Sequence, residues 1–220
     1  MAQCAVIIPV SASEPSLPVL LESLQNAGWT QQIWVSGKHE PENLPEHVYW
    51  LQSGGGRAHS MNAAAYVTPA IYLWFLHADS VVNERNVAAV YEFAQCQPSA
   101  IGYFDLRFYG GTWPMRLLLM RITEAGVWFR SRLFKAPFGD QGLCMSKVQF
   151  QRLGGYSEKA PYGEDHLLVL QAQKKHISCL PVNSSLLTSA RKYHKNGWFA
   201  TTALHLKLWW KQRQSFGRLQ

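Results

Sequence analysis

The sequence has few charges, few cysteines and no long apolar run. Only 16% of its 220 residues are charged and 47% are hydrophobic, a balance that excludes an intrinsically disordered chain. The four cysteines lie far apart and form no C-x-x-C pair, which argues against a zinc site or a disulfide framework and favours reduced, mostly buried thiols. No apolar run approaches the ~20 residues that span a bilayer. The first ten residues have no basic region and predict a strand, not a signal peptide.

Positive charge is in excess. Lysine and arginine total 21 against 14 aspartates and glutamates, and the formal net charge is +7. This balance fits an anionic partner, which could be a nucleotide, a nucleic acid or an anionic membrane surface. The sequence contains no recognised nucleic-acid-binding module, so we expect no nucleic-acid partner.

Strand-like and helical segments alternate over roughly the first hundred residues. Strands are predicted at 4–10, 31–37, 47–53 and 70–79, and helices at 16–28, 54–67 and 83–95. This alternation predicts an α/β fold with a mostly parallel central sheet flanked by helices. The second half is less regular, with strands predicted at 100–110, 141–147 and 177–182 and helices at 113–134, 147–156, 164–176 and 198–214. Because no repeat or linker interrupts the chain, residues 1–220 are predicted to form one domain.

Acidic side chains recur where a ligand is expected. Asp79 ends the most hydrophobic predicted strand, at the edge where such sheets bind ligands. It either holds a hard cation or is a turn residue or helix N-cap. Glu164 and Asp165 open a predicted helix, where the helix dipole favours acids and where one of them could act as a general base. Asp140 and Gln141 lie between two glycines, in a turn or at a pocket wall.

Basic and polar residues accompany these acids. The glycine run 54–56 and Arg57 open another predicted helix, which could bind an anion or be an ordinary flexible turn. The basic run from Arg191 to Lys195 could clamp a diphosphate or form a solvated loop. His77 lies in no paired histidine motif, which favours a polar crevice residue over a metal ligand.

Six motifs occur in the order found in glycosyltransferase family 2: IIPV, GRAHSMNAAA, LHADS, FGDQGLCMSKVQFQRLGGY, GEDHLLVLQAQKK and TSARKY. The chain most resembles the small bacterial members that carry the patterns GRA-x-Q-M-N, LHADT, GDQ and SARRW. The resemblance extends from about residue 5 to about residue 195.

The resemblance implies a GT-A fold with a nucleotide-binding half (about 1–97) and an acceptor-binding half (about 98–197). It also implies an inverting glycosyltransferase that moves a sugar from a nucleotide-diphospho-sugar to a hydroxyl acceptor, assisted by a divalent metal, Mn²⁺ or Mg²⁺. Asp79 would hold the metal, and Asp165 would be the general base, supported by Glu164. The positions that would bind the nucleotide sugar are Pro9, Arg57, Asn62, His77, Asp140, Gln141 and Arg191.

Departures from the family pattern leave an alternative open. Glu14 is displaced by one position from an expected Asn-Glu pair, and Ser36 stands where the family has an aspartate that contacts the nucleoside. The motif HAD contains a single acid, and Tyr193 replaces a tryptophan. The alternative is a catalytically degenerate binding or scaffold protein with the same fold.

The C-terminal segment, about 198–220, predicts an amphipathic helix. Leu206, Trp209 and Trp210 alternate there with Lys207 and Lys211, so the helix either lies at a lipid interface or packs on the domain. An interfacial helix would suit a lipid-linked acceptor. We expect a cytoplasmic protein, peripheral at the inner face of the membrane if this helix binds lipid.

Overall fold

A central sheet of eight strands organises the protein, in the order β3-β2-β1-β4-β7-β6-β8-β5. The computed structural model describes residues 3–11, 14–110, 114–160, 162–191, 193 and 197–218. Four neighbouring strands of the first half run parallel: β1 (Cys4–Val10), β2 (Gln32–Gly37), β3 (Val48–Gln52) and β4 (Tyr72–Phe75). The remaining strands are β5 (Ser80–Val81), β6 (Ile101–Tyr109), β7 (Cys144–Ser146) and β8 (Cys179–Ser189). Strand β7 is antiparallel to β4 and β6, β8 is parallel to β6, and β5 is antiparallel to β8.

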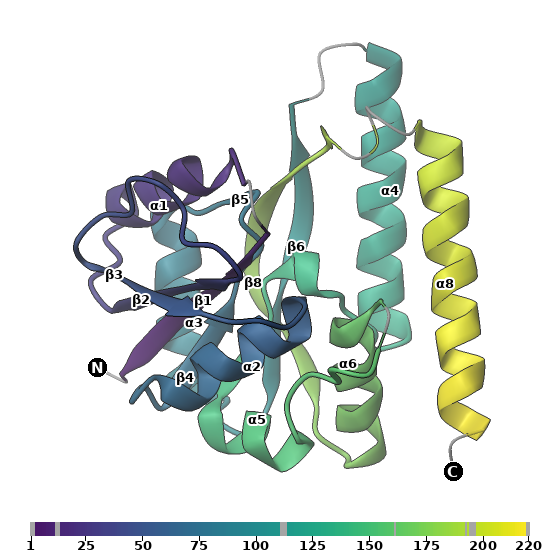
Figure 1. Ribbon diagram of the computed structural model, residues 1–220. Helices are drawn as coiled ribbons and strands as arrows, with labels where there is room; N and C mark the ends of the chain where they lie inside the picture. The colour runs from purple at the N-terminus through teal and green to yellow at the C-terminus, as the bar shows by residue number, and fades with distance from the viewer. Residues whose placement is uncertain are drawn as a thin grey trace.

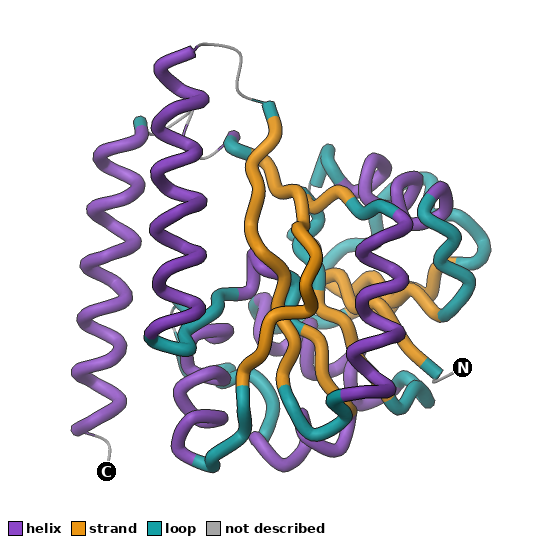
Figure 2. Tube along the Cα trace, turned by 180° about the vertical axis from the view of Figure 1, so that it is seen from behind, coloured by secondary structure: helices purple, strands orange, loops and turns teal. Residues whose placement is uncertain are grey.

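Helices cover both faces of this sheet (Figure 1). One face carries α1 (Leu17–Asn26) and α3 (Glu84–Cys96), and the other carries α2 (Arg57–Val67), α5 (Lys147–Leu153) and α6 (Glu164–Lys174). Two long helices, α4 (Pro114–Leu133) and α8 (Trp198–Arg218), stand side by side at the edge of the molecule, as Figures 1 and 2 both show. No helix in the described part of the chain is long and apolar enough to cross a membrane.

Strand β1 shows why the first segment is apolar throughout. Val6 and Ile8 belong to the core beneath α1 and α3, whereas Ala5 and Ile7 belong to the core beneath α2, α5 and α6. Successive side chains of a strand point to opposite faces, so a strand with both faces covered has no polar position. All four side chains are fully buried.

The predicted α/β fold with a mostly parallel sheet is confirmed, and some element bounds differ from the prediction. The strand predicted at 70–79 ends at Phe75, so the segment that contains Asp79 lies beyond it. The segment 141–147 begins as a 3₁₀ turn, η1 (Gly139–Gln141), and only its end forms β7. Strand β8 continues past the predicted end at 182, because after a bulge it pairs with the second half of β6. The short β5 had no sequence signal.

A side-chain cap fixes the start of α3, and three of the four cysteines are buried, as the sequence predicts. Asn83 caps α3, since its side chain accepts a hydrogen bond from the backbone N–H of Asn86 at 3.1 Å. All four cysteines are free, and Cys96 alone among them is exposed.

Candidate active site

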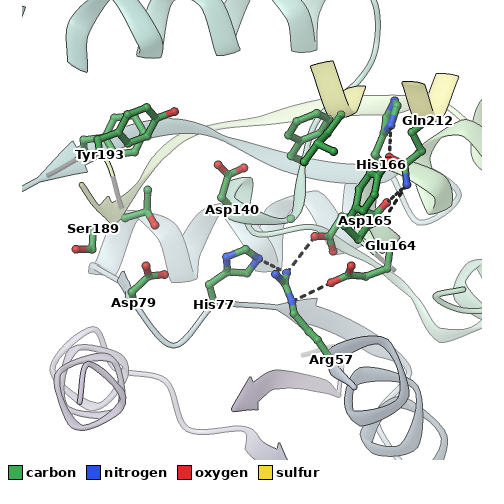
Figure 3. A pocket seen from close by; sticks show the side chains of 17 residues that line it. Arg57, His77, Asp79, Asp140, Glu164, Asp165, His166, Ser189, Tyr193 and Gln212 are labelled. Atoms are coloured by element: carbon green, nitrogen blue, oxygen red, sulfur yellow. Dashed lines mark hydrogen bonds and ion pairs between the residues drawn. The ribbon is translucent and has the colours of Figure 1, made fainter. Parts of the chain in front are cut away.

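A cavity of about 320 Å³ opens where the C-terminal ends of β6 and β8 meet the segment after β4, η1 and the first turns of α2 and α6. This is the sheet edge at which α/β folds bind ligands. Figure 3 shows side chains from these distant parts of the chain converging on one space. Six of the residues that we predicted as site residues line it: Arg57, His77, Asp79, Asp140, Glu164 and Asp165.

Arg57 contacts three other side chains that line the cavity. It is the first residue of α2, and its Nε lies 3.2 Å from Oε1 of Glu164 while its Nη2 lies 3.0 Å from Oδ2 of Asp165. Nη2 also contacts Nε2 of His77. Although burial opposes the charged form, the carboxylates of Asp165 and Glu164 raise the pKa of the Arg57 guanidinium. Arg57 therefore stays charged and holds both acids in place.

Asp165 has the proton affinity expected of a general base near neutral pH. Burial raises the pKa of this carboxyl from its ordinary 3.8 to about 6, the charge of Arg57 opposes the rise, and Glu164 and Asp140 add to it. The side chain is only 12% exposed. Within the described residues, no donor reaches its Oδ1 atom. Arg57 thus holds one oxygen, and the other is buried against the turn that contains Gly139.

The turn η1 passes directly against Asp165. A Cβ atom at Gly139 would overlap the Asp165 carboxylate, so only glycine permits this approach. The next residue, Asp140, turns its side chain into the cavity (Figure 3). Gln141 lies behind the turn, fully buried, where its Nε2 donates to the carbonyl of Phe104 at 2.9 Å and its Oε1 accepts from Ser131 Oγ at 2.9 Å. Gln141 therefore fixes the turn and does not line the cavity.

Asp79 and Asp140 are the carboxylates suited to a metal. The carbonyl of Asp79 accepts hydrogen bonds from the backbone N–H of Ser189 and the hydroxyl of Tyr109, both at 3.2 Å, which attach this segment to β8 and β6. Oδ1 of Asp140 is buried and has no hydrogen-bond partner within the described residues.

The described residues contain no group of three or more His, Cys, Asp or Glu side chains that could hold a metal by itself. A hard cation that bridges phosphates takes only one or two carboxylates and fills its remaining positions with phosphate oxygens and water. Asp79 and Asp140 both line the cavity and could supply carboxylates to a cation of this kind, whereas the described residues offer no all-protein metal cage.

No sequence pattern indicates that α8 contributes to this cavity, which its residues Leu208 and Gln212 line. Nε2 of Gln212 donates to the carbonyls of Tyr162 at 2.9 Å and Gly163 at 3.0 Å, and its Oε1 is 2.8 Å from Nδ1 of His166. Gly163 directly precedes α6 and has a positive φ of 68°. The C-terminal helix therefore fixes the loop that positions Glu164 and Asp165, which helical periodicity alone does not reveal.

The remaining predicted site residues lie outside the cavity lining. Pro9 is part of β1. Asn62 is buried, and its Oδ1 accepts from the backbone N–H of Tyr156 at 2.8 Å while its Nδ2 donates to the carbonyl of Tyr156 at 2.9 Å. Arg191 is exposed, and residues 192, 194 and 195 of its basic run lie outside the described residues. The predicted ligand contacts of Pro9, Asn62 and Arg191 stay predictions.

A second cavity, of about 560 Å³, lies beside the segments that follow β1 and β2. Four glutamates contribute to its lining: Glu14, Glu22, Glu40 and Glu42. At the end of β2, Ser36 is fully buried, and its hydroxyl has no partner within the described residues. The segment where an aspartate was expected to contact a nucleoside therefore offers a buried serine instead.

The architecture matches solved structures of the GT-A class. S. aureus TarS 1–349 superposes with a TM-score of 0.64 at 16% identity, over 86% of this chain and 60% of that one. The same TarS fragment in complex with UDP-GlcNAc gives a TM-score of 0.60 at 17% identity, over 86% of this chain and 58% of that one. The mannosyltransferase PcManGT from Pyrobaculum calidifontis, in complex with GDP-Man and Mn²⁺, gives a TM-score of 0.60 at 14% identity, over 84% of this chain and 56% of that one.

These likenesses establish the fold, and the protein has the GT-A fold that the motifs implied. The chain spans 56% to 60% of the length of these solved chains. No protein-family model matches the chain, and no curated protein matches it in sequence. Membership of glycosyltransferase family 2 stays a prediction.

Proposed function

We propose that the protein is an inverting glycosyltransferase that moves a sugar from a nucleotide-diphospho-sugar to a hydroxyl acceptor. The observation that carries the proposal is Asp165: a buried carboxylate with a pKa raised to about 6, in a cavity that also holds Asp79 and Asp140. A general base works best when its pKa lies near the working pH. Two proteins of the same fold were solved in complex with UDP-GlcNAc and with GDP-Man, which supports a nucleotide sugar as the donor.

In the proposed reaction, Asp165 accepts the proton of the acceptor hydroxyl as the hydroxyl oxygen attacks the anomeric carbon. The new C–O bond forms on the face opposite the diphosphate, the bond to the diphosphate oxygen breaks, and the configuration at the anomeric carbon inverts. Arg57 keeps the pKa of Asp165 below the value that burial alone would give, so that the base is ionised near neutral pH. Gly139 lets the turn η1 approach this carboxylate, and Gln212 holds the loop before it.

A divalent cation would be held by Asp79, with Asp140 as a second carboxylate of the same cavity. When bound, it would neutralise the negative charge that develops on the departing diphosphate. PcManGT was solved with Mn²⁺, which supports this assignment for the fold.

A second candidate is a non-catalytic binding protein with the same fold. It is favoured by Ser36, which replaces the expected nucleoside-binding aspartate, and by the acidic lining of the neighbouring cavity. Such a protein would bind a nucleotide or a sugar without turnover.

The first experiment is a thermal-shift panel of UDP-, GDP-, dTDP- and CDP-sugars, each with and without Mn²⁺, because a ligand of the native state raises Tm. Asp79→Asn should remove the Mn²⁺-dependent part of the shift. Slow hydrolysis of the active donor, followed by NMR, should then release a sugar of inverted configuration, and Asp165→Asn should abolish this release. A nucleotide-dependent shift without any turnover would instead support the binding protein, and retention of configuration would refute the inverting mechanism.

A further inference from the structure

Helices α4 and α8 expose apolar side chains to solvent. Four of these, on α4, follow the spacing i, i+4, i+11, i+15, which places them on one side of that helix. Two more, on α8, are eleven residues apart and share one side in the same way. We define the outer face by these six residues, which are between 50% and 78% exposed: Leu118, Ile122, Phe129, Leu133, Phe199 and Trp210.

The exposed sides of both helices face outward together, because their buried sides contact the rest of the protein. On α4, Glu124 accepts a hydrogen bond from the backbone N–H of Phe108 in β6 at 2.8 Å. On α8, Gln212 contacts the start of α6. Trp198 Nε1 donates to Thr123 Oγ1 at 2.8 Å and joins the two helices. Figures 1 and 2 show α4 and α8 as adjacent, nearly parallel rods at the margin of the molecule.

The charges around the outer face have one sign. The sequence of α8 contains no acid, and that of α4 contains only Glu124, which is 6% exposed and pairs with Arg107 and Arg121. The Arg121 side chain is 67% exposed, and Lys207 of α8 is exposed as well. The side chains of Leu206, Trp209 and Lys211, which suggested an interfacial helix, lie outside the described residues.

Apolar side chains flanked by cations, without an exposed acid on either helix, match an anionic lipid surface. Acyl chains accept the leucine, isoleucine and aromatic side chains, and anionic head groups attract the arginine and lysine. A nucleic acid would use the cations but would gain nothing from exposed Leu118, Ile122 and Leu133.

We propose that the outer face of α4 and α8 docks the protein on an anionic membrane, with both helices lying in the plane of the interface. Leu208 and Gln212, on the inner side of α8, line the candidate active site, so docking places that cavity one helix away from the lipid. An acceptor anchored in the lipid would suit this arrangement. That consequence rests on the proposed function, whereas the docking itself does not.

Vesicle flotation of the full chain tests the docking. The protein should float with vesicles of phosphatidylcholine containing about 30% phosphatidylglycerol, and less so at high salt, because salt screens the attraction of the cations to the head groups. The double variant Phe129→Glu, Trp210→Glu should lower the vesicle affinity more than about tenfold, since both buried apolar contacts are lost. The matched control is Val148→Glu, at a 71% exposed apolar position on α5, which should bind as wild type does.

Three results would overturn the proposal. The first is that folded wild-type protein does not float with the vesicles, and the second is that the double variant floats as well as wild type does. The third is that light scattering shows a dimer for wild type and a monomer for the double variant. The last result would show that the face joins two copies of the chain. Circular dichroism and the nucleotide-sugar thermal shift should be unchanged in both variants, which separates failure of docking from failure of the proposed function.

Discussion

Replacing Asp165 with Asn should stabilise the protein above pH 6 while abolishing turnover. The pKa of this carboxyl is about 6 in the folded chain against an ordinary 3.8, so the native state binds its proton more tightly than the unfolded state does. Its ionisation therefore costs stability as the pH rises from about 4 to about 6, and the gap between the two pKa values corresponds to about 3 kcal/mol at pH 8. Asn resembles the protonated acid, so the variant should recover up to about 3 kcal/mol at pH 8 and nothing below pH 4.

Urea unfolding at pH 4, 6 and 8 measures this difference without any substrate. Glu158→Gln is a control in which the pH dependence of stability should be reversed, because hydrogen bonds from Asn62 and His59 lower the pKa of the Glu158 carboxyl. Its carboxylate stabilises the fold once ionised, so this variant should be the less stable one at pH 8 and equal to wild type at low pH. An Asp165→Asn protein with the same stability difference from wild type at pH 4 and pH 8 would refute the raised pKa and, with it, the assignment of the base.

Three further predictions concern the same chain. Gly139→Ala should lower turnover by about 10²-fold, because the new Cβ atom displaces the Asp165 carboxylate. Gly54→Ala is the control and should leave turnover unchanged, because a Cβ atom at Gly54 meets no neighbouring atom. Equal activity of the two variants would contradict the argument. Arg57→Gln should move the acid limb of the kcat/KM profile from near pH 6 to higher pH, because the charge that lowers the pKa of Asp165 is lost; an unmoved midpoint would refute this. Iodoacetamide should rapidly label one thiol per folded chain, that of Cys96, since burial raises the pKa of the other three; mass spectrometry showing a second fast adduct would be the contrary result.

The helices and strands of the first half could be predicted from the sequence because each depends on the hydrophobic pattern of its own segment. The apolar run at 4–10 and the alternation of strands with helices reflect burial on both faces of a sheet, which each segment records in its own composition. The pairing of β8 with β6 was not readable beyond residue 182, because its outer half is held by a partner strand about 80 residues away and by a bulge. Long-range pairing of this kind leaves no local periodicity.

Several candidate site residues were recognisable as residue types in motifs, but their partners were not. Arg57 stands at a helix start in the sequence, where it suggested an anion site, and the structure places it against Asp165, 108 positions away. Gln141 and Asn62 belong to the same motifs as lining residues, yet the fold turns them inward to fix backbone turns. A motif records which residues occur together in sequence and does not record which way each side chain points.

The sequence by itself determined the α/β class, the order of its main elements and the acids from which a site could be built. Hydrophobic periodicity and residue chemistry are properties of each segment, so they do not depend on how the chain folds. Only the tertiary structure decided that Asp165 is buried beside Arg57 and that α8 reaches back to the loop before α6. Burial raises the pKa of the Asp165 carboxyl and the charge of Arg57 limits that rise, and both effects depend on atoms that the chain brings together only when it folds.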